Sequence, residues 1–132
     1  MRILQPRYVY LCSYGAYIMN NLFTYVSTIN SSSENELIVE RNVVEELVED
    51  NGVVTQYSEQ IVKFRNGVTI KQSIEKEVES SNTEVVCEES FINYEVLFEP
   101  ENYDITPKRK NFINHCQEAF WVKISTVQNA NT

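Results

Sequence analysis

The sequence predicts a single α+β domain, an antiparallel β-meander of five or six strands with a C-terminal helix packed on the sheet. Two observations predict this fold. Apolar and polar residues alternate with a period of two from residue 53 to residue 98, which is typical of strands that bury one face. Turn sequences at Asn66-Gly67 and Ser81-Asn82-Thr83 interrupt the alternation. The length of 132 residues suits one domain, 1–132, with one core.

The first part of the chain is expected to add strands to this sheet. Residues 23–29 are rich in aromatic and branched side chains, which favour a strand. Residues 8–12 are a further candidate strand. Pro6, Gly15 and four tyrosines interrupt the apolar residues near the start, so a signal peptide is not expected. Residues 1–18 are interpreted as a poorly defined extension of the domain.

The segment 36–50 has two interpretations beyond its first residues. Residues 36–41 are expected to form a strand. Residues 42–50 either continue this strand to a tight turn at Asn51-Gly52 or form a helix with Asn42 as its N-cap and Glu45 three residues later. Both patterns fit the sequence, so these nine residues stay open between helix and strand.

The central strand is expected over residues 68–79, after a three-residue loop closed by Gly67 in the left-handed region. This loop sets a register that pairs Val62 with Ile70 and Gln60 with Gln72. A second hairpin at residues 81–83 would pair Ile70 with Tyr94 and Lys76 with Glu88. The predicted core consists of Val62, Phe64, Val68, Ile70, Ile74, Val78, Ile92, Tyr94, Val96 and Phe98.

The C-terminal part is expected to start with a helix over residues 107–117. Thr106-Pro107 resembles an N-cap followed by proline at the first helical position. Phe112, Ile113 and Cys116 would then form its buried stripe. Alternation from residue 120 suggests a final strand, and residues 128–132 are expected to be a frayed tail.

The charge is concentrated in the predicted sheet. The chain has a net charge of −8, and residues 34–104 hold 18 acidic and 5 basic side chains. Glu75, Glu77 and Glu79 lie about 6.6 Å apart on the polar side of the central strand, because alternate residues share a face. Such a row repels phosphates, so direct binding of nucleic acid is not expected. It would attract a basic protein surface, although a solvated face that only confers solubility has the same pattern.

The sequence therefore supports two hypotheses of function. The first is a non-catalytic inhibitor or adaptor whose carboxylate-rich face, with Glu75, Glu77, Glu79 and Lys71, binds a basic protein surface. By compositional analogy only, the type is that of bacterial or phage accessory proteins that block a partner handling nucleic acid. The alternative is a small-molecule binder that uses the concave side of the sheet. Its contact residues would be Gln60, Gln72, Lys76 and Tyr94, which could equally hydrogen-bond one another.

Catalytic and metal-binding patterns are not found in the sequence. His115 is followed directly by Cys116, but neighbours in sequence point in different directions on a helix or a strand. One histidine and three separated cysteines lack the close pairs of a zinc site. The three glycines form no phosphate-binding loop. We therefore expect neither an enzyme nor a bound cofactor or metal.

Three observations bear on compartment and assembly. Cys12, Cys87 and Cys116 are odd in number and widely spaced, which favours free thiols and a reducing, cytoplasmic location. No run of 18 apolar residues is present, so no membrane span is expected. Exposed edge strands would be compatible with a homodimer. The basic run of residues 108–110 is interpreted as a solvated turn or as a segment that docks on the acidic sheet.

Overall fold

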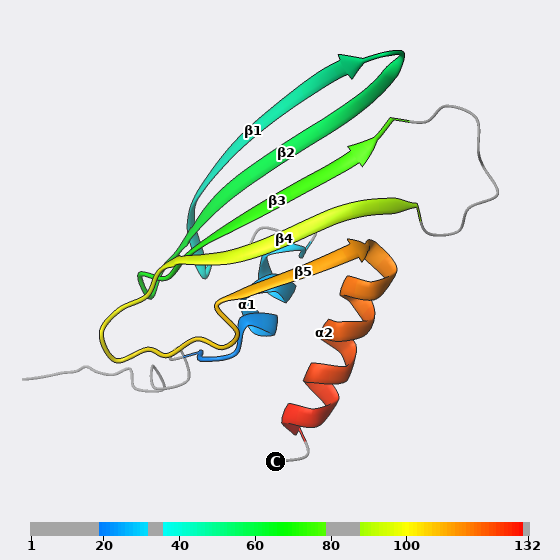
Figure 1. Ribbon diagram of the computed structural model, residues 1–132. Coiled ribbons are helices and arrows are strands. Elements are labelled where there is room, and N and C mark those ends of the chain that lie inside the picture. The colour runs from blue at the N-terminus through cyan, green and yellow to red at the C-terminus, as the bar shows by residue number, and fades with distance from the viewer. Residues whose placement is uncertain (1–18, 32–35, 79–87, 131–132) are drawn as a thin grey trace, which may run out of the picture.

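The chain forms one five-stranded antiparallel sheet with two helices packed on one of its faces, which confirms the predicted fold class (Figure 1). The computed structural model describes residues 19–31, 36–78 and 88–130. The strands lie side by side in their order along the chain, so the sheet is a simple meander. The elements are α1 (Leu22–Ile29), β1 (Ile38–Asp50), β2 (Val53–Phe64), β3 (Thr69–Glu77), β4 (Glu89–Phe98), β5 (Arg109–Asn114) and α2 (His115–Ala130).

The strand expected over residues 23–29 is instead the helix α1, so that prediction is wrong. Leu22, Tyr25, Val26 and Ile29 are its buried residues, and their spacing of three and four residues places them on one side of a helix. This side packs on the sheet. The helical spacing therefore outweighs the strand preference of the individual aromatic and branched residues.

β1 and β2 form a long hairpin, which includes residues 42–50, the segment whose sequence fits either a helix or a strand. Asn51 and Gly52 close it with φ angles of 54° and 85°, the positive values that a type I′ turn requires. Residues 42–50 are all strand, each opposite a partner in β2. A strand prevails because this ladder supplies partners for the backbone, whereas a helix of nine residues is marginal in water.

β2 and β3 pair in the predicted register. Val62 lies opposite Ile70 and Gln60 opposite Gln72. At the hairpin end the Phe64 N–H donates to the carbonyl of Val68 at 2.8 Å, and Gly67 has a φ of 96°. The three-residue loop with glycine in the left-handed region is therefore confirmed.

β3 and β4 pair two residues away from the predicted register. Ile70 lies opposite Val96, not Tyr94, and Gln72 takes the position opposite Tyr94. The expected pair of Lys76 with Glu88 is also absent from the described ladder, which ends at Glu75. A shift of two keeps the paired side chains from Phe91 to Val96 on their predicted faces, so the alternation alone cannot distinguish the two registers. The turn expected at residues 81–83 lies outside the described residues, as does the candidate strand 8–12.

The C-terminal part differs most from its prediction. The Thr106–Pro107 peptide bond is cis, and no helix starts there. Residues 109–114 form the strand β5, which pairs with β4 at one edge of the sheet. The helix α2 occupies the region where a final strand was expected. The side chain of Asn114 accepts a hydrogen bond from the Gln117 N–H at 2.7 Å, and the Gln117 side chain accepts one from the Ile113 N–H at 2.9 Å. The first bond satisfies an N–H group in the first turn of α2, and the second joins that turn to the end of β5. The helix begins eight residues later than predicted.

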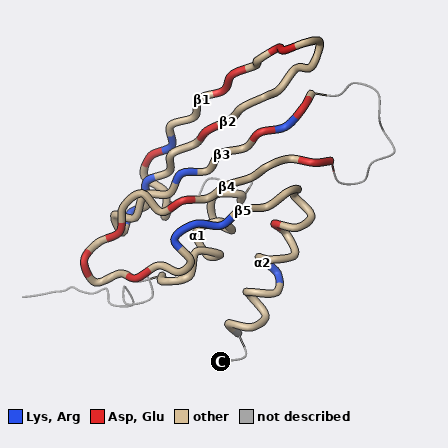
Figure 2. The backbone as a smooth tube through the Cα atoms, in the orientation of Figure 1, with Lys and Arg blue, Asp and Glu red and all other residues tan. Residues whose placement is uncertain are grey.

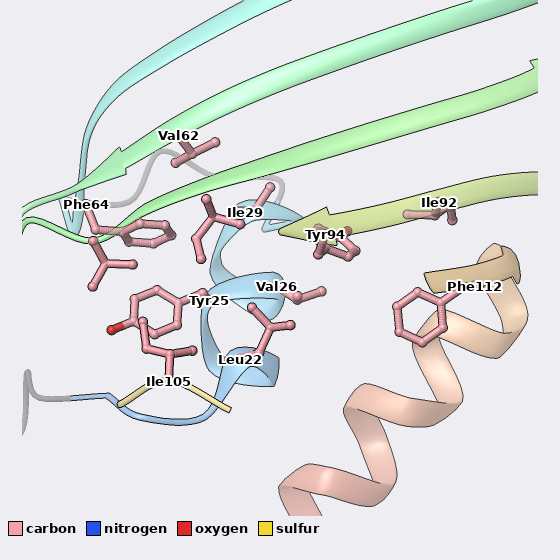
Figure 3. Packing of buried hydrophobic residues seen from close by; sticks show 12 residues of the cluster. Leu22, Tyr25, Val26, Ile29, Val62, Phe64, Ile92, Tyr94, Ile105 and Phe112 are labelled. Carbon is pink, nitrogen blue, oxygen red and sulfur yellow. The ribbon is translucent and has the colours of Figure 1, made fainter. Parts of the chain in front are cut away.

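The core lies between the sheet and the helices (Figure 3). Of the predicted core residues, six are buried, and Ile74 and Val96 are partly buried. Val78 and Phe98 are 51% and 58% exposed, so their assignment to the core is wrong. Val78 lies beyond the end of β3, on the part of the sheet that extends away from the helices. Phe98 lies opposite Thr69 after an irregularity in the ladder, which places it on the opposite face from Val96. The six confirmed core residues are Val62, Phe64, Val68, Ile70, Ile92 and Tyr94.

Of the three residues expected to form a buried stripe, Phe112, Ile113 and Cys116, only Phe112 is buried. Phe112 is 3% exposed, whereas Ile113 is 52% exposed and Cys116 is also exposed. Because residues 112 and 113 belong to a strand, they point to opposite faces of the sheet. Phe112 packs against Trp121 of α2, with ring centroids 5.3 Å apart.

Candidate functional site

The two faces of the sheet have different surroundings. The inner face carries Val62, Ile70 and Tyr94 and is covered by α1 and α2. The outer face is the opposite one; it carries Tyr57, Ser73 and Phe91 by alternation, and no described helix covers it (Figure 1). Each face carries a candidate site.

A set of polar side chains, the inner-face network, crosses the covered face. Its members are Asn30, Arg41, Gln60, Gln72, Tyr94, His115 and Glu118. Gln60, Gln72 and Tyr94 lie opposite one another on three neighbouring strands. The Gln60 Nε2 donates to the Gln72 Oε1 at 3.0 Å, and the Gln72 Nε2 donates to the Tyr94 hydroxyl at 2.8 Å. The shift in the β3–β4 register is what brings Gln72 beside Tyr94.

The two helices close the network from the other side. Asn30, at the end of α1, accepts from the Gln72 Nε2 at 3.2 Å and donates to the Glu118 Oε2 at 3.2 Å. The Tyr94 hydroxyl also donates to the Glu118 Oε2. Glu118 lies in the first turn of α2 and is 6% exposed. A buried carboxylate needs such donors, because an unpaired buried charge is costly.

The ends of the network reach the surface. The Arg41 Nη1 donates to the Gln60 Oε1 at 2.6 Å and to the Ile29 carbonyl at 3.3 Å. At the other end, the His115 Nδ1 lies 3.4 Å from the Glu118 Oε1. The polar groups thus pair with one another across the sheet and both helices.

The pKa of Tyr94 follows from these surroundings. Burial raises the pKa of the Tyr94 hydroxyl well above its usual value, and the neighbouring Glu118 carboxylate raises it further. The hydroxyl therefore keeps its proton at neutral pH and acts as a hydrogen-bond donor. This arrangement stabilises the contact between β4 and α2.

Three of the four residues predicted for the small-molecule alternative belong to this network. Gln60, Gln72 and Tyr94 are brought together, and they hydrogen-bond one another. Lys76 is exposed and lies opposite Gln56, further along the sheet from the helices. The geometry thus matches the interpretation in which these polar groups satisfy one another.

The outer face carries a groove of about 680 Å³ that crosses all five strands. Apolar side chains contribute to it from several strands, and they are unusually exposed. Val44 is 66% exposed, Phe91 51% and Ile113 52%, and Tyr57 lies among them at 39%. The sequence pattern could not reveal this patch, because it treats the outer face as a polar one.

Carboxylates accompany these apolar side chains in the same groove. Glu46, Glu59 and Glu75 lie on β1, β2 and β3, and all three line it. None of them belongs to an ion pair among the described residues. Figure 2 shows acidic residues along the part of the sheet that extends away from the helices. The groove therefore combines an apolar floor with uncompensated negative charge.

Of the four residues predicted to bind a partner, three are described, and only one of these lines the outer-face groove. Glu75 lines the groove, and Glu77 is exposed at the end of β3 on the same face. Lys71 shares this face but lies 3.9 Å from the Glu95 carboxylate, on the part of the sheet nearer the hairpin at Gly67. Glu79 lies outside the described residues. Glu46 and Glu59 were missed because the sequence analysis considered carboxylates on one strand only.

The basic run docks within the chain. The Lys108 ammonium lies 2.8 Å from Glu99 and 2.9 Å from Asp104, and the Arg109 guanidinium lies 2.8 Å from Glu95. Lys110 lies over the ring of Trp121, 5.6 Å from its centroid. Docking on the acidic sheet is therefore matched by Arg109 alone, since Lys108 pairs with carboxylates of the connection after β4 and Lys110 packs on α2.

The neighbouring pair of His115 and Cys116 does not form a nucleophilic site. Cys116 is disulfide-bonded, so the expectation of three free thiols is wrong. The other cysteines, Cys12 and Cys87, lie outside the described residues. His115 contacts Glu118 instead of the thiol. Across the described ranges, no cluster of three or more potential metal ligands is found.

Neither described helix combines the length and the apolar character needed to cross a membrane. Searches with protein-family models, of curated proteins and of solved structures give no match to this chain.

Proposed function

We propose that the protein is a non-catalytic inhibitor or adaptor that binds a basic protein surface through the outer face of its sheet. One observation carries the proposal: exposed Tyr57 and Phe91 lie in the same groove as the uncompensated carboxylates Glu59 and Glu75. Protein interfaces commonly combine aromatic anchors at their centre with charged residues around them.

The partner is expected to present lysine or arginine around a few apolar side chains. The carboxylates of the groove would attract the partner's basic side chains, and the apolar side chains of both surfaces would be removed from water on binding. Surfaces that hold nucleic acid have this basic character, so a partner that handles nucleic acid is part of the proposal. A cytoplasmic location also stays a prediction, and the disulfide at Cys116 removes part of its support.

Affinity capture from the native host, repeated at low and high salt, tests the proposal. The protein and the double variant Glu59→Lys/Glu75→Lys are compared as baits. We expect the variant to lose the captured partner, and we expect capture by the unchanged protein to weaken steeply with salt. The matched control is Glu101→Lys, which reverses an exposed carboxylate in the turn after β4.

Capture that is insensitive to salt and equal for both baits would refute the proposal. The variant Tyr57→Ala separates the apolar contribution from the charge. We expect it to weaken capture at high salt as well, because hydrophobic contacts are not screened by ions.

A further inference from the structure

The strand β1 is an edge of the sheet, and it is long and exposed. It stands last in the strand order with β2 as its only neighbour among the described residues. It spans 13 residues, and every residue after Ile38 is exposed. Figure 1 shows β1 running along the upper margin of the sheet, away from α2.

The register shows which backbone groups of β1 point away from the sheet. The Phe64 N–H bonds to Val68, so the even-numbered residues of β2 bond toward β3 and the odd-numbered ones toward β1. The partners of those odd-numbered residues are the even-numbered residues of β1, such as Val44 opposite Glu59. The outward N–H and C=O groups therefore belong to Arg41, Val43, Glu45, Leu47 and Glu49.

This edge lacks most of the features that prevent strand pairing. Edge strands are commonly short, or carry lysine, proline or a bulge. β1 contains no lysine or proline, and its register is regular from Glu40 to Asp50. The opposite edge, β5, has six residues, includes Lys110 and leads directly into α2. The same sheet thus has one protected edge and one available edge.

The side chains of β1 indicate what can pair with it. The strand holds five carboxylates and one arginine, a net charge of −4. The arginine, Arg41, is turned toward Gln60 and the Ile29 carbonyl. Val43 and Leu47 are 55% and 67% exposed between the carboxylates. Two copies of this strand would bring like charges together, whereas a strand that carries both basic and apolar residues on each of its faces would match both features.

We propose that β1 binds an extended, lysine- or arginine-rich segment of a partner protein, which adds as a sixth strand to the sheet. The backbone groups of the five outward residues supply the hydrogen bonds, and the carboxylates select a basic segment. This contact uses the edge of the sheet and not the groove, so it goes beyond the proposed function and does not depend on it.

The test uses a fluorescein-labelled peptide of twelve residues in which pairs of lysines alternate with pairs of valine or threonine, so that each face of the added strand carries both kinds of residue. We expect fluorescence anisotropy to show binding that weakens with salt, and hydrogen exchange to show new protection of the Val43, Glu45 and Leu47 amides. The variant Val43→Pro removes one outward N–H and no β1–β2 bond. It should weaken peptide binding at least about tenfold, which corresponds to about 1.4 kcal/mol.

The matched control is Asn111→Pro at the other edge. The same alternation of hydrogen bonds makes Asn111 an outward-facing residue of β5, so this variant should bind the peptide normally. A second peptide with methylated amides at alternate positions should not bind to the unchanged protein. Equal binding of both peptides, or protection away from β1, would overturn the proposal. A second outcome would also overturn it: the unchanged protein sediments as a dimer at micromolar concentration, and Val43→Pro dissociates this dimer. The edge would then be covered by a second copy of the chain.

Discussion

The Tyr94 hydroxyl donates a hydrogen bond to the Glu118 carboxylate, which joins the inner face of β4 to the first turn of α2. Both side chains are buried, and Asn30 contacts both of them from the end of α1. Three elements that are far apart in the sequence thus meet at one carboxylate. This contact links the first turn of α2 to the inner face of the sheet, beside the packing of Trp121 of α2 on Phe112 of β5.

Replacing Tyr94 with phenylalanine should destabilise the protein. The ring still fills its site beside Phe112, but Glu118 loses one donor and retains Asn30 and His115. We expect the free energy of unfolding to fall by about 1–3 kcal/mol, the usual cost of leaving a buried polar group short of a partner. Urea unfolding measures the change. Tyr57→Phe, which removes an exposed hydroxyl, should leave the stability unchanged, and an equal loss in both variants would contradict the role of Glu118.

Stability should fall at alkaline pH because of Tyr25. Burial raises the pKa of Tyr25 to about 12, and its hydroxyl donates to the Met19 carbonyl at 2.7 Å. In the unfolded chain the group ionises near pH 10, so unfolding releases a proton between pH 10 and pH 12. The stabilisation is complete below pH 10 and is lost as the pH rises toward 12.

The measurement for Tyr25 is the slope of the unfolding free energy against pH over this window. Tyr25→Phe should make the slope less steep. Tyr94 adds to the slope of the unchanged protein in the same direction, since its pKa is also raised. An identical slope in the protein and in Tyr25→Phe would contradict the prediction.

The sheet could be predicted from the sequence because its signals are local. Alternation assigns faces, and Asn51-Gly52 and Gly67 have the positive φ angles that their turns require. The register between β3 and β4 could not be predicted, because a shift of two residues leaves the same faces in place. The helix α1 was missed for a different reason: Tyr25 and Val26 favour strands individually, and the sheet that makes a helix preferable lies later in the chain.

One local signal for α2 is present in the sequence and was not used. Asn114 and Gln117 have the spacing of a capping box, and the Asn114 side chain accepts the expected bond from the Gln117 N–H. The Gln117 side chain reaches back one residue further than in a capping box, to the N–H of Ile113. The proline after Thr106 gave a competing start signal eight residues earlier. The outer-face groove could not be predicted from local sequence signals. It depends on residues from five strands that meet on an uncovered face of the sheet.

The number of free thiols checks the disulfide of Cys116. The chain has three cysteines, and Cys116 is disulfide-bonded, so one free thiol is expected in the unreduced, denatured protein. Titration with a chromogenic thiol reagent gives this number, and peptide mapping without reduction identifies the partner of Cys116. The variant Cys116→Ser should raise the number from one to two. Three free thiols in the unchanged protein would contradict the bond.

Phe91 and Ile92 provide a direct test of which face of the sheet is the core. They are neighbours on β4 that point to opposite faces: Phe91 is 51% exposed in the outer groove, and Ile92 is 1% exposed between the sheet and the helices. Ile92→Ala should lower the free energy of unfolding by about 2–5 kcal/mol, because it leaves a cavity in the core. Phe91→Ala removes the larger side chain but should cost less than about 1 kcal/mol, since it leaves no cavity. Chemical unfolding of the two variants measures the difference. Equal losses would mean that the outer face is covered in solution, for example by a second copy, and Phe91 could then not serve a partner of another kind.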